Sequence, residues 1–409
     1  MKPQFFCKYI SIILFLFLFL LIFTGCGIFK KRPPEIIENA LRRIGSSEYP
    51  DFFDDMDYDG LENCILGSLS YLNRVSPIVK FRFGQDIFNS PHMIKSLEHF
   101  LNFIRTKPLK DELIQYIKEN YLIYSTVGSA DTPGQVFFTG YFEPVLQGSL
   151  NKDTEYQFPI YVRPDDLTTI DLSLFSQQFK GKTIVGRYIN QSVVPYYDRK
   201  EIEYQGLLKG KVQEIAWLKD RLDLFFLQIQ GSGKIHLDNG DIINVHYHGS
   251  NGQPYRSIGK LLVDQGKISR EEISMQKIID YLRHHPEEIE TVLNYNPSYV
   301  FFKIEKDGPL GSLEVKLTPG RSIALDRRLF PLAGLAFIET KKPFINGDGT
   351  IDQWMAFSRF VLNQDTGGAI RGPGRADLFW GNGPYAEIAA GHMQELGNLY
   401  FLILKPDIL

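Results

Sequence analysis

The stretch Val136-Phe-Phe-Thr-Gly-Tyr-Phe142 marks the point at which the character of the chain changes. Its aromatic and β-branched residues favour an extended strand. Further along, from Tyr299 to Leu409, short apolar runs recur between turns that are rich in glycine and proline. Many short strands separated by such turns predict a small closed barrel rather than an open parallel sheet.

The chain before this stretch differs from the chain after it. Residues 35 to 125 carry apolar side chains at helical spacing, as in Ile65, Leu69 and Leu72, and we interpret them as a helical layer packed on the rest. The nearly continuous apolar run Leu224-Phe-Phe-Leu-Gln-Ile-Gln230 is expected to form a buried strand. The overall prediction is a mainly β fold with a helical N-terminal layer.

The N-terminus carries the pattern of an export signal. Lys2 and Lys8 precede an apolar run from Tyr9 to Phe23, which is shorter than the roughly 20 apolar residues that span a bilayer. The run leads into Phe23-Thr-Gly-Cys26, and small residues before a cysteine resemble the bacterial lipoprotein processing box, in which that cysteine is lipidated. An uncleaved anchor helix is the alternative, and it would also place the protein at a membrane.

The composition excludes several classes of function. The 409 residues are 44% hydrophobic and carry a net charge of −3, so no basic surface for nucleic acid is expected. If Cys7 leaves with the signal and Cys26 is lipidated, Cys64 has no partner for a disulfide. His246 and His248 share a strand face but lack a third ligand, so neither a metal nor another cofactor is predicted.

The residues that could carry chemistry gather near the C-terminus. Five glycines lie within residues 367–381, between and beside the carboxylates Asp365 and Asp377 and next to Trp380. Glycine lets the backbone approach a ligand closely, and carboxylates beside a flat aromatic ring suit a carbohydrate. Composition alone slightly favours the alternative of a long surface loop in which both aspartates cap turns. Trp380 could likewise belong to the core.

A second cluster lies in Gln228-Ile-Gln-Gly-Ser-Gly233. In a strand, Gln228 and Gln230 would point to one face, and together with Ser232 they could bind sugar hydroxyls. A hairpin turn explains this segment at least as well. Residues 251–259 could line a groove or merely cap the helix that follows them.

These segments, taken together and in order, resemble the MltA family of membrane-bound lytic murein transglycosylases. The resemblance runs from about residue 135 to the C-terminus. Its carriers are Phe138-Thr-Gly-Tyr-Phe-Glu-Pro144, Phe158-Pro-Ile-Tyr161, Glu214-Ile-Ala-Trp217, Leu227-Gln-Ile-Gln-Gly-Ser-Gly233, Asn251-Gly-Gln-Pro-Tyr-Arg-Ser-Ile-Gly259, Asn296-Pro-Ser-Tyr-Val-Phe-Phe302 and the segment from Asp365-Thr-Gly-Gly-Ala-Ile370 to Asp377.

The resemblance implies a double-psi β-barrel domain with a smaller inserted β domain and, between them, a groove that holds a glycan strand. For this chain the implied division is a signal peptide at 1–25, a tether at 26–34, a helical part with the first barrel segment at 35–143, the inserted domain at 144–298 and the catalytic, 3D-type barrel part at 299–409.

The resemblance also implies a lytic exotransglycosylase that cleaves the β-1,4 bond between N-acetylmuramic acid and N-acetylglucosamine and leaves a 1,6-anhydromuramoyl end. Asp377 matches the catalytic aspartate, acting as acid and then as base, and Asp365 matches a supporting carboxylate. An acid needs a raised pKa, so we predict that Arg371 and Arg375 point away. The expected substrate contacts are Thr139, Tyr141, Gln230, Ser232, Gly367, Gly368 and Trp380.

The expected partners are glycan strands of peptidoglycan and a membrane, reached through lipidated Cys26. Gly27 follows that cysteine, and we expect a monomer on the periplasmic face of the outer membrane. Two other functions remain open, namely a non-catalytic lipoprotein that binds the wall and a two-carboxylate muramidase that releases reducing ends.

Overall fold

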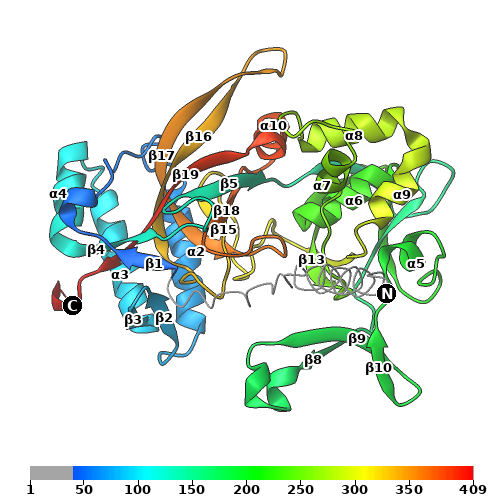
Figure 1. Cartoon of the computed structure of the whole chain (residues 1–409), viewed down its shortest axis with the longest axis horizontal. Coiled ribbons are helices and arrows are strands. Elements are labelled where there is room, and N and C mark those ends of the chain that lie inside the picture. The colour runs from blue at the N-terminus through cyan, green and yellow to red at the C-terminus, as the bar shows by residue number, and fades with distance from the viewer. Residues whose placement is uncertain (1–39, 409) are drawn as a thin grey trace, which may run out of the picture. The chain divides into compact units, whose positions relative to one another are not determined.

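Six strands from distant parts of the chain close into a barrel in this computed structural model, which describes residues 40–408 (Figure 1). They run in the order β19-β16-β17-β15-β18-β5, and β5 pairs back onto β19. This confirms the predicted mainly β fold with a closed barrel. The strands are β5 (Val136–Tyr141), β15 (Ser322–Ala324), β16 (Leu335–Ile345), β17 (Ile351–Asp365), β18 (Arg375–Phe379) and β19 (Glu395–Leu404).

The predicted signal peptide, tether and lipidation site Cys26 lie outside the described residues. Within residues 40–408, no helix has both the length and the apolar character needed to cross a bilayer.

The region before the barrel contains helices and strands rather than helices alone. The helices α2 (Leu61–Arg74), α3 (Ser90–Ile104) and α4 (Lys110–Asn120) alternate with β1 (Leu41–Arg43), the hairpin of β2 (Lys80–Phe83) and β3 (Asp86–Asn89), and β4 (Tyr121–Thr126). The helical prediction was wrong for β4, because its aromatic and β-branched residues extend the barrel sheet beyond β19. Helix α2 packs on β17, and α3 packs on β19.

A second sheet of six strands is formed by the part of the sequence between the first barrel strand, β5, and the next one, β15. Its order is β14-β13-β12-β6-β11-β7, and its own core includes Ile160, Leu227 and Phe302. Strand β14 pairs with β13 and not with the barrel, so we propose that the inserted domain continues to about residue 305. The strands are β6 (Val145–Ser149), β7 (Phe158–Tyr161), β11 (Glu214–Leu218), β12 (Ser232–Leu237), β13 (Ile242–Ser250) and β14 (Val300–Glu305).

The run Leu224–Gln230, expected to be a strand, is the second half of helix α6 (Arg221–Gln230). A short apolar run cannot be assigned to strand or helix from its periodicity, so the residues at its ends decide. The Asp220 side chain accepts a hydrogen bond from the Leu222 amide at the N-terminus. Gly231 ends the helix with a φ of 79°, a conformation that glycine adopts without strain.

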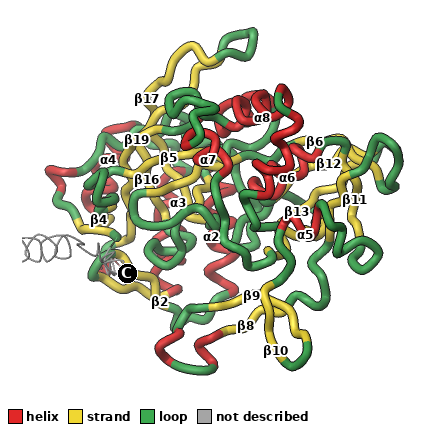
Figure 2. The backbone as a smooth tube through the Cα atoms, turned by 45° about the vertical axis from the view of Figure 1, so that its right-hand side comes forward, coloured by secondary structure: helices red, strands yellow, loops and turns green. Residues whose placement is uncertain are grey.

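The remaining elements surround the second sheet and the barrel. A small sheet of β8 (Thr168–Asp171), β9 (Thr183–Ile189) and β10 (Ser192–Pro195) lies at the lower edge of the molecule in Figure 2. The other helices are α5 (Arg199–Glu203), α7 (Ile258–Asp264), α8 (Met275–His284), α9 (Ile289–Asn294) and α10 (Pro384–His392). Short 3-10 turns occupy Ser46–Glu48, Leu172–Leu174, Gln177–Phe179, Pro286–Glu288 and Pro406–Ile408.

Candidate active site

The barrel places the two candidate carboxylates in one row across four strands. Ala324 of β15 pairs with Asp365 of β17 on one side and with Asp377 of β18 on the other. Asp377 in turn lies opposite Thr139 of β5. Neighbouring strands are about 4.8 Å apart, so the Cα atoms of the two aspartates are roughly 10 Å apart, and their side chains project from the same face.

Asp377 is held by one hydrogen bond. The Thr139 hydroxyl donates to its Oδ1 at 2.9 Å. No described residue donates to Oδ2, and Oδ2 is not among the buried atoms that lack a partner, so it is open to solvent. Burial raises the pKa of Asp377 to about 6, against the opposing effects of Thr139 and Arg375. A carboxyl with this pKa is partly protonated near neutrality, as a general acid requires.

Asp365 has a different set of partners. It accepts hydrogen bonds from the Tyr141 hydroxyl at 2.9 Å and from the amides of Ser312 and Thr366, both at 2.8 Å. Burial raises its pKa, while these donors lower it. Three donors favour the ionised form. The negative charge of Asp365 also raises the pKa of Asp377, but this effect is smaller than that of burial.

The residue next to Asp365 anchors the end of β17. The Gln364 amide nitrogen donates to the Cys64 carbonyl at 2.7 Å and to the Ser68 hydroxyl at 3.0 Å. Its oxygen accepts from the Ser322 hydroxyl at 2.7 Å and from the Cys64 thiol at 3.2 Å. Cys64 belongs to the region predicted to be helical and lies in α2, and this buried free thiol helps to fix the strand that carries Asp365.

Arg375 contradicts the prediction that both arginines point away from the acid. Its Nη2 donates to the Thr139 hydroxyl at 3.2 Å, and its guanidinium lies 5.0 Å from the centre of the Phe137 ring. Arg375 and Asp377 are two residues apart on β18, so strand alternation puts both on one face, a signal already present in the sequence. Arg371 is exposed and donates to the Ile370 carbonyl instead.

Two of the predicted sugar contacts, Tyr141 and Gln230, have hydrogen-bond partners within the protein, and a third, Ser232, is buried. Burial and the neighbouring carboxylates raise the pKa of Tyr141 well above its usual value, so its phenol remains a neutral donor to Asp365. Gln230 ends α6, and its side-chain oxygen accepts a hydrogen bond from the Phe142 amide at 3.1 Å. Ser232 begins β12 with 7% of its surface exposed, so it presents little hydroxyl surface to a ligand.

Trp380 belongs to the core. Only 7% of its surface is exposed, and it packs edge-on against Phe357 and Tyr385, with ring centres 6.3 and 5.9 Å apart. Of the two roles considered for Trp380, this packing favours the one in the core. Gly367 and Gly368 follow β17 in the loop that leads to β18, and Gly368 is exposed.

Tyr255 is the residue near the site that sequence reasoning did not single out. It lies in the segment 251–259, where Ser257 caps α7 by accepting a hydrogen bond from the Lys260 amide at 3.1 Å. Tyr255 is 42% exposed. Burial raises its pKa, and its hydrogen bond with Ser257 and the positive charges of Arg199 and Arg375 oppose this, so its phenol lies within electrostatic reach of Arg375.

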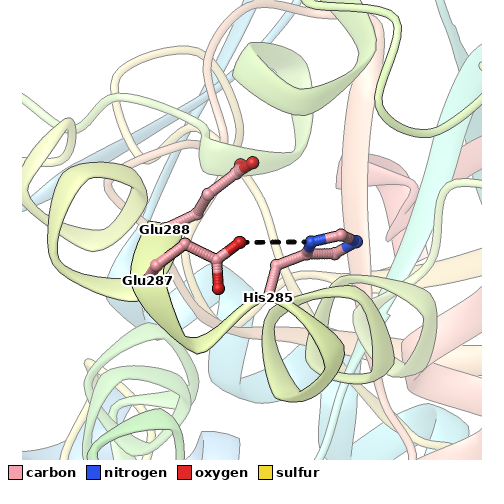
Figure 3. A group of neighbouring side chains, drawn as sticks. All are labelled: His285, Glu287 and Glu288. Atoms are coloured by element: carbon pink, nitrogen blue, oxygen red, sulfur yellow. Dashed lines mark ion pairs between the residues drawn. The ribbon is translucent and has the colours of Figure 1, made fainter.

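Among residues 40–408, one group has the side chains and spacing to hold a cation, namely His285, Glu287 and Glu288 (Figure 3). His285 and Glu287 already form an ion pair at 3.4 Å. Glu288 accepts from Lys267 and from the Tyr281 hydroxyl, both at 2.8 Å. These contacts explain the group as a surface ion-pair network at the end of α8.

Two family models match this chain. The MltA specific insert domain matches residues 137–303, and the 3D domain matches residues 321–403. The first match begins within β5 and ends within β14, and the second contains the other barrel strands except Leu404, the last residue of β19.

Related proteins cover most of the chain. It is 32% identical over 284 residues to membrane-bound lytic murein transglycosylase A of Vibrio cholerae and 34% identical over 280 residues to the Escherichia coli protein of that name, with 68% of both chains covered in each case. A membrane-bound lytic murein transglycosylase from Agrobacterium tumefaciens superposes with a TM-score of 0.73 at 29% identity, covering 89% of this chain and 98% of that one. Escherichia coli MltA with bound chitohexaose gives a TM-score of 0.67 at 26% identity, covering 90% and 96%.

Proposed function

The chain belongs to the MltA family of membrane-bound lytic murein transglycosylases, which act on peptidoglycan, and we propose that it cleaves the β-1,4 bond between N-acetylmuramic acid and N-acetylglucosamine to leave 1,6-anhydromuramoyl ends. The roles proposed for the two aspartates rest on one observation, the difference between their surroundings. Asp377 has a single donor, an open Oδ2 and a pKa of about 6, whereas Asp365 has three donors. We therefore propose Asp377 as the catalytic acid and Asp365 as the ionised carboxylate beside it.

The proposed reaction needs only one proton carrier. Asp377 gives the proton on Oδ2 to the glycosidic oxygen as the bond from that oxygen to the muramoyl C1 breaks. The resulting carboxylate then takes the proton from the muramoyl C6 hydroxyl as its oxygen bonds to C1. No water is consumed. Attack by a tethered hydroxyl can be worth about 7–11 kcal/mol relative to a bimolecular step, which compensates for the missing second base.

The neighbours of the two aspartates support this division. Because Thr139 donates to Oδ1 of Asp377, the acidic proton is directed to the open Oδ2. Asp365, in its ionised form, can stabilise the positive charge that develops on the sugar ring during glycosidic cleavage, and its three donors favour that form against the effect of burial. Tyr141 holds Asp365 in place, because its phenol stays protonated.

We further propose that the enzyme works in the cell envelope as a monomer. The related proteins are named as membrane-bound. Lipidation of Cys26, which lies outside the described residues, would hold the enzyme at the periplasmic face of the outer membrane, within reach of glycan strands.

Mass spectrometry of peptidoglycan digested by the purified protein tests this function. Anhydromuramoyl ends are expected with the wild type, and the folded Asp377→Asn variant should give none. Reducing ends would indicate a muramidase that uses both carboxylates, and an absence of cleavage would indicate a protein that only binds the wall. Turnover at the wild-type rate by the Asp377→Asn variant would contradict the role of Asp377.

A further inference from the structure

We propose that Arg375 binds a carboxylate carried by the 3-O-substituent of the muramoyl residue, which makes the site selective for muramoyl glycan over neutral N-acetylglucosamine glycan. The inference rests on the proposed function. N-acetylmuramic acid differs from N-acetylglucosamine by a 3-O-lactyl group, whose carboxyl is free in bare glycan and is joined to a stem peptide with its own carboxylates in substituted glycan.

The first argument is that Arg375 forms no direct ion pair among the described residues, although the charge of Asp377 acts on it from a longer distance. Two buried arginines in or next to the barrel strands are each paired with an aspartate, Arg321 with Asp54 at 2.6 Å and Arg359 with Asp55 at 2.8 Å. Within the described part of the chain, no carboxylate forms an ion pair with Arg375. Its contacts are the neutral Thr139 hydroxyl and the Phe137 ring.

An arginine side chain remains charged at any physiological pH and has five N–H donors. Half-burying this charge without an anion costs free energy, so the unused donors of Arg375 are suited to an anion supplied by a ligand. Those nitrogens are absent from the buried atoms that lack partners, which means that they are open to solvent. A guanidinium binds a carboxylate through two parallel hydrogen bonds.

The second argument is position. Arg375 and Asp377 lie on the same face of β18, and a strand rises about 3.3 Å per residue, so their Cα atoms are roughly 7 Å apart. The guanidinium therefore lies beside the sugar whose bond Asp377 would break. Tyr255 of the inserted domain, which is 42% exposed, lies within electrostatic reach of Arg375. An acidic substituent of that sugar would meet the Arg375 guanidinium.

Pairing of Arg375 with a substrate carboxylate would also explain why a guanidinium lies beside the proposed acid, Asp377. The groups that face Asp377 are Thr139, Arg375 and Asp365, and of these Thr139 and Arg375 lower its pKa. A substrate carboxylate bound to Arg375 would offset the guanidinium charge. The acid would then hold its proton more firmly in the complex than in the free enzyme, which is when the proton is needed.

The test measures binding to the full chain that carries Asp377→Asn, so that no substrate is consumed. Calorimetric titrations compare neutral chitohexaose, muramoyl glycan stripped of peptides and muramoyl glycan with intact stems. Adding Arg375→Gln should lower the ratio of muramoyl to chitohexaose affinity by about tenfold, or about 1.4 kcal/mol. Arg371→Gln is the matched control and should leave that ratio unchanged, and Arg375→Lys should retain part of the preference.

The two sources of carboxylate are separated by the glycan whose affinity falls. A loss limited to stripped glycan identifies the lactyl carboxylate, and a loss limited to stem-bearing glycan identifies a peptide carboxylate. An unchanged ratio with both glycans overturns the proposal. In that case the wild type would still form anhydro ends, whereas failure of the proposed function would remove those ends altogether.

A second measurement needs no change at Arg375 and therefore does not depend on how its variants fold. Ion pairs that solvent can reach weaken as salt rises. The preference for muramoyl glycan should therefore decline between about 50 mM and about 500 mM NaCl, while chitohexaose affinity changes little. A preference that does not depend on salt would contradict a guanidinium–carboxylate contact.

Discussion

Replacing Thr139 with valine would remove the one hydrogen bond that Asp377 receives, with little change in side-chain volume. The Thr139 hydroxyl donates to Oδ1 at 2.9 Å and stabilises the ionised carboxylate, which lowers the pKa of Asp377. A hydrogen bond to a charged group is worth about 1.5–3 kcal/mol. Because Asp377 is partly accessible to solvent, the lower end of this range applies, and about 1.4 kcal/mol corresponds to one pH unit.

The assay is the pH dependence of kcat/KM for release of anhydromuropeptides. The protonated form of Asp377 is the active one, so activity falls as the pH rises through its pKa, which is about 6 in the wild type. In Thr139→Val this alkaline limb should move upward by about one pH unit, whatever happens to the maximal rate. Thr139→Ser keeps the hydroxyl and should keep the limb in place. An unmoved limb, or one that moves to lower pH, would refute the proposed partnership of Thr139 with the acid.

Three further changes test the site. Asp377→Asn should raise the free energy of unfolding at pH 8 by up to about 3 kcal/mol and should give no gain near pH 3. The reason is that the raised pKa of Asp377 costs the wild type stability as the pH rises through about 6. Urea unfolding that finds the variant less stable at pH 8 would contradict this. Tyr141→Phe removes one of three donors to Asp365 and should lower kcat about tenfold, whereas an unchanged kcat would rule out support through Tyr141. Trp380→Ala should destabilise the protein by about 3–5 kcal/mol in thermal unfolding. A small loss of stability combined with a large loss of glycan affinity would instead support the sugar-stacking role.

Local sequence patterns predicted the correct secondary structure where a single signal, residue type or spacing, dominates a segment. The aromatic and β-branched stretch 136–142 contains barrel strand β5, and the helical spacing around Leu69 lies in α2. The pattern failed for Leu224–Gln230, because a short apolar run fits a buried strand and a buried helix equally well. There, the capping Asp220 and the terminal Gly231 were the stronger signals.

Part of the candidate site could likewise be predicted from the sequence, and part could not. The two aspartates and their glycine-rich surroundings could be picked out from the residues, and the order of the upstream motifs pointed to their chemistry. The direction of Arg375 and the burial of Trp380 could not be read with the same security. The direction of Arg375 follows from strand alternation only once β18 is known to begin at Arg375, and an aromatic ring next to a carboxylate suits a sugar or a core.

The amino-acid order specifies which groups are available. They are two carboxylates, a threonine and a tyrosine on alternating strand positions, and two arginines, Arg371 in the loop between β17 and β18 and Arg375 at the start of β18. It does not specify that Asp365, Ala324, Asp377 and Thr139 form a row, because that row depends on the pairing of β17, β15, β18 and β5, and some of these strands, such as those of Thr139 and Asp377, are more than 200 residues apart. The difference between the two acids also arises in the folded chain. Burial and hydrogen-bond donors set a pKa, and both come from residues that meet only when the barrel closes.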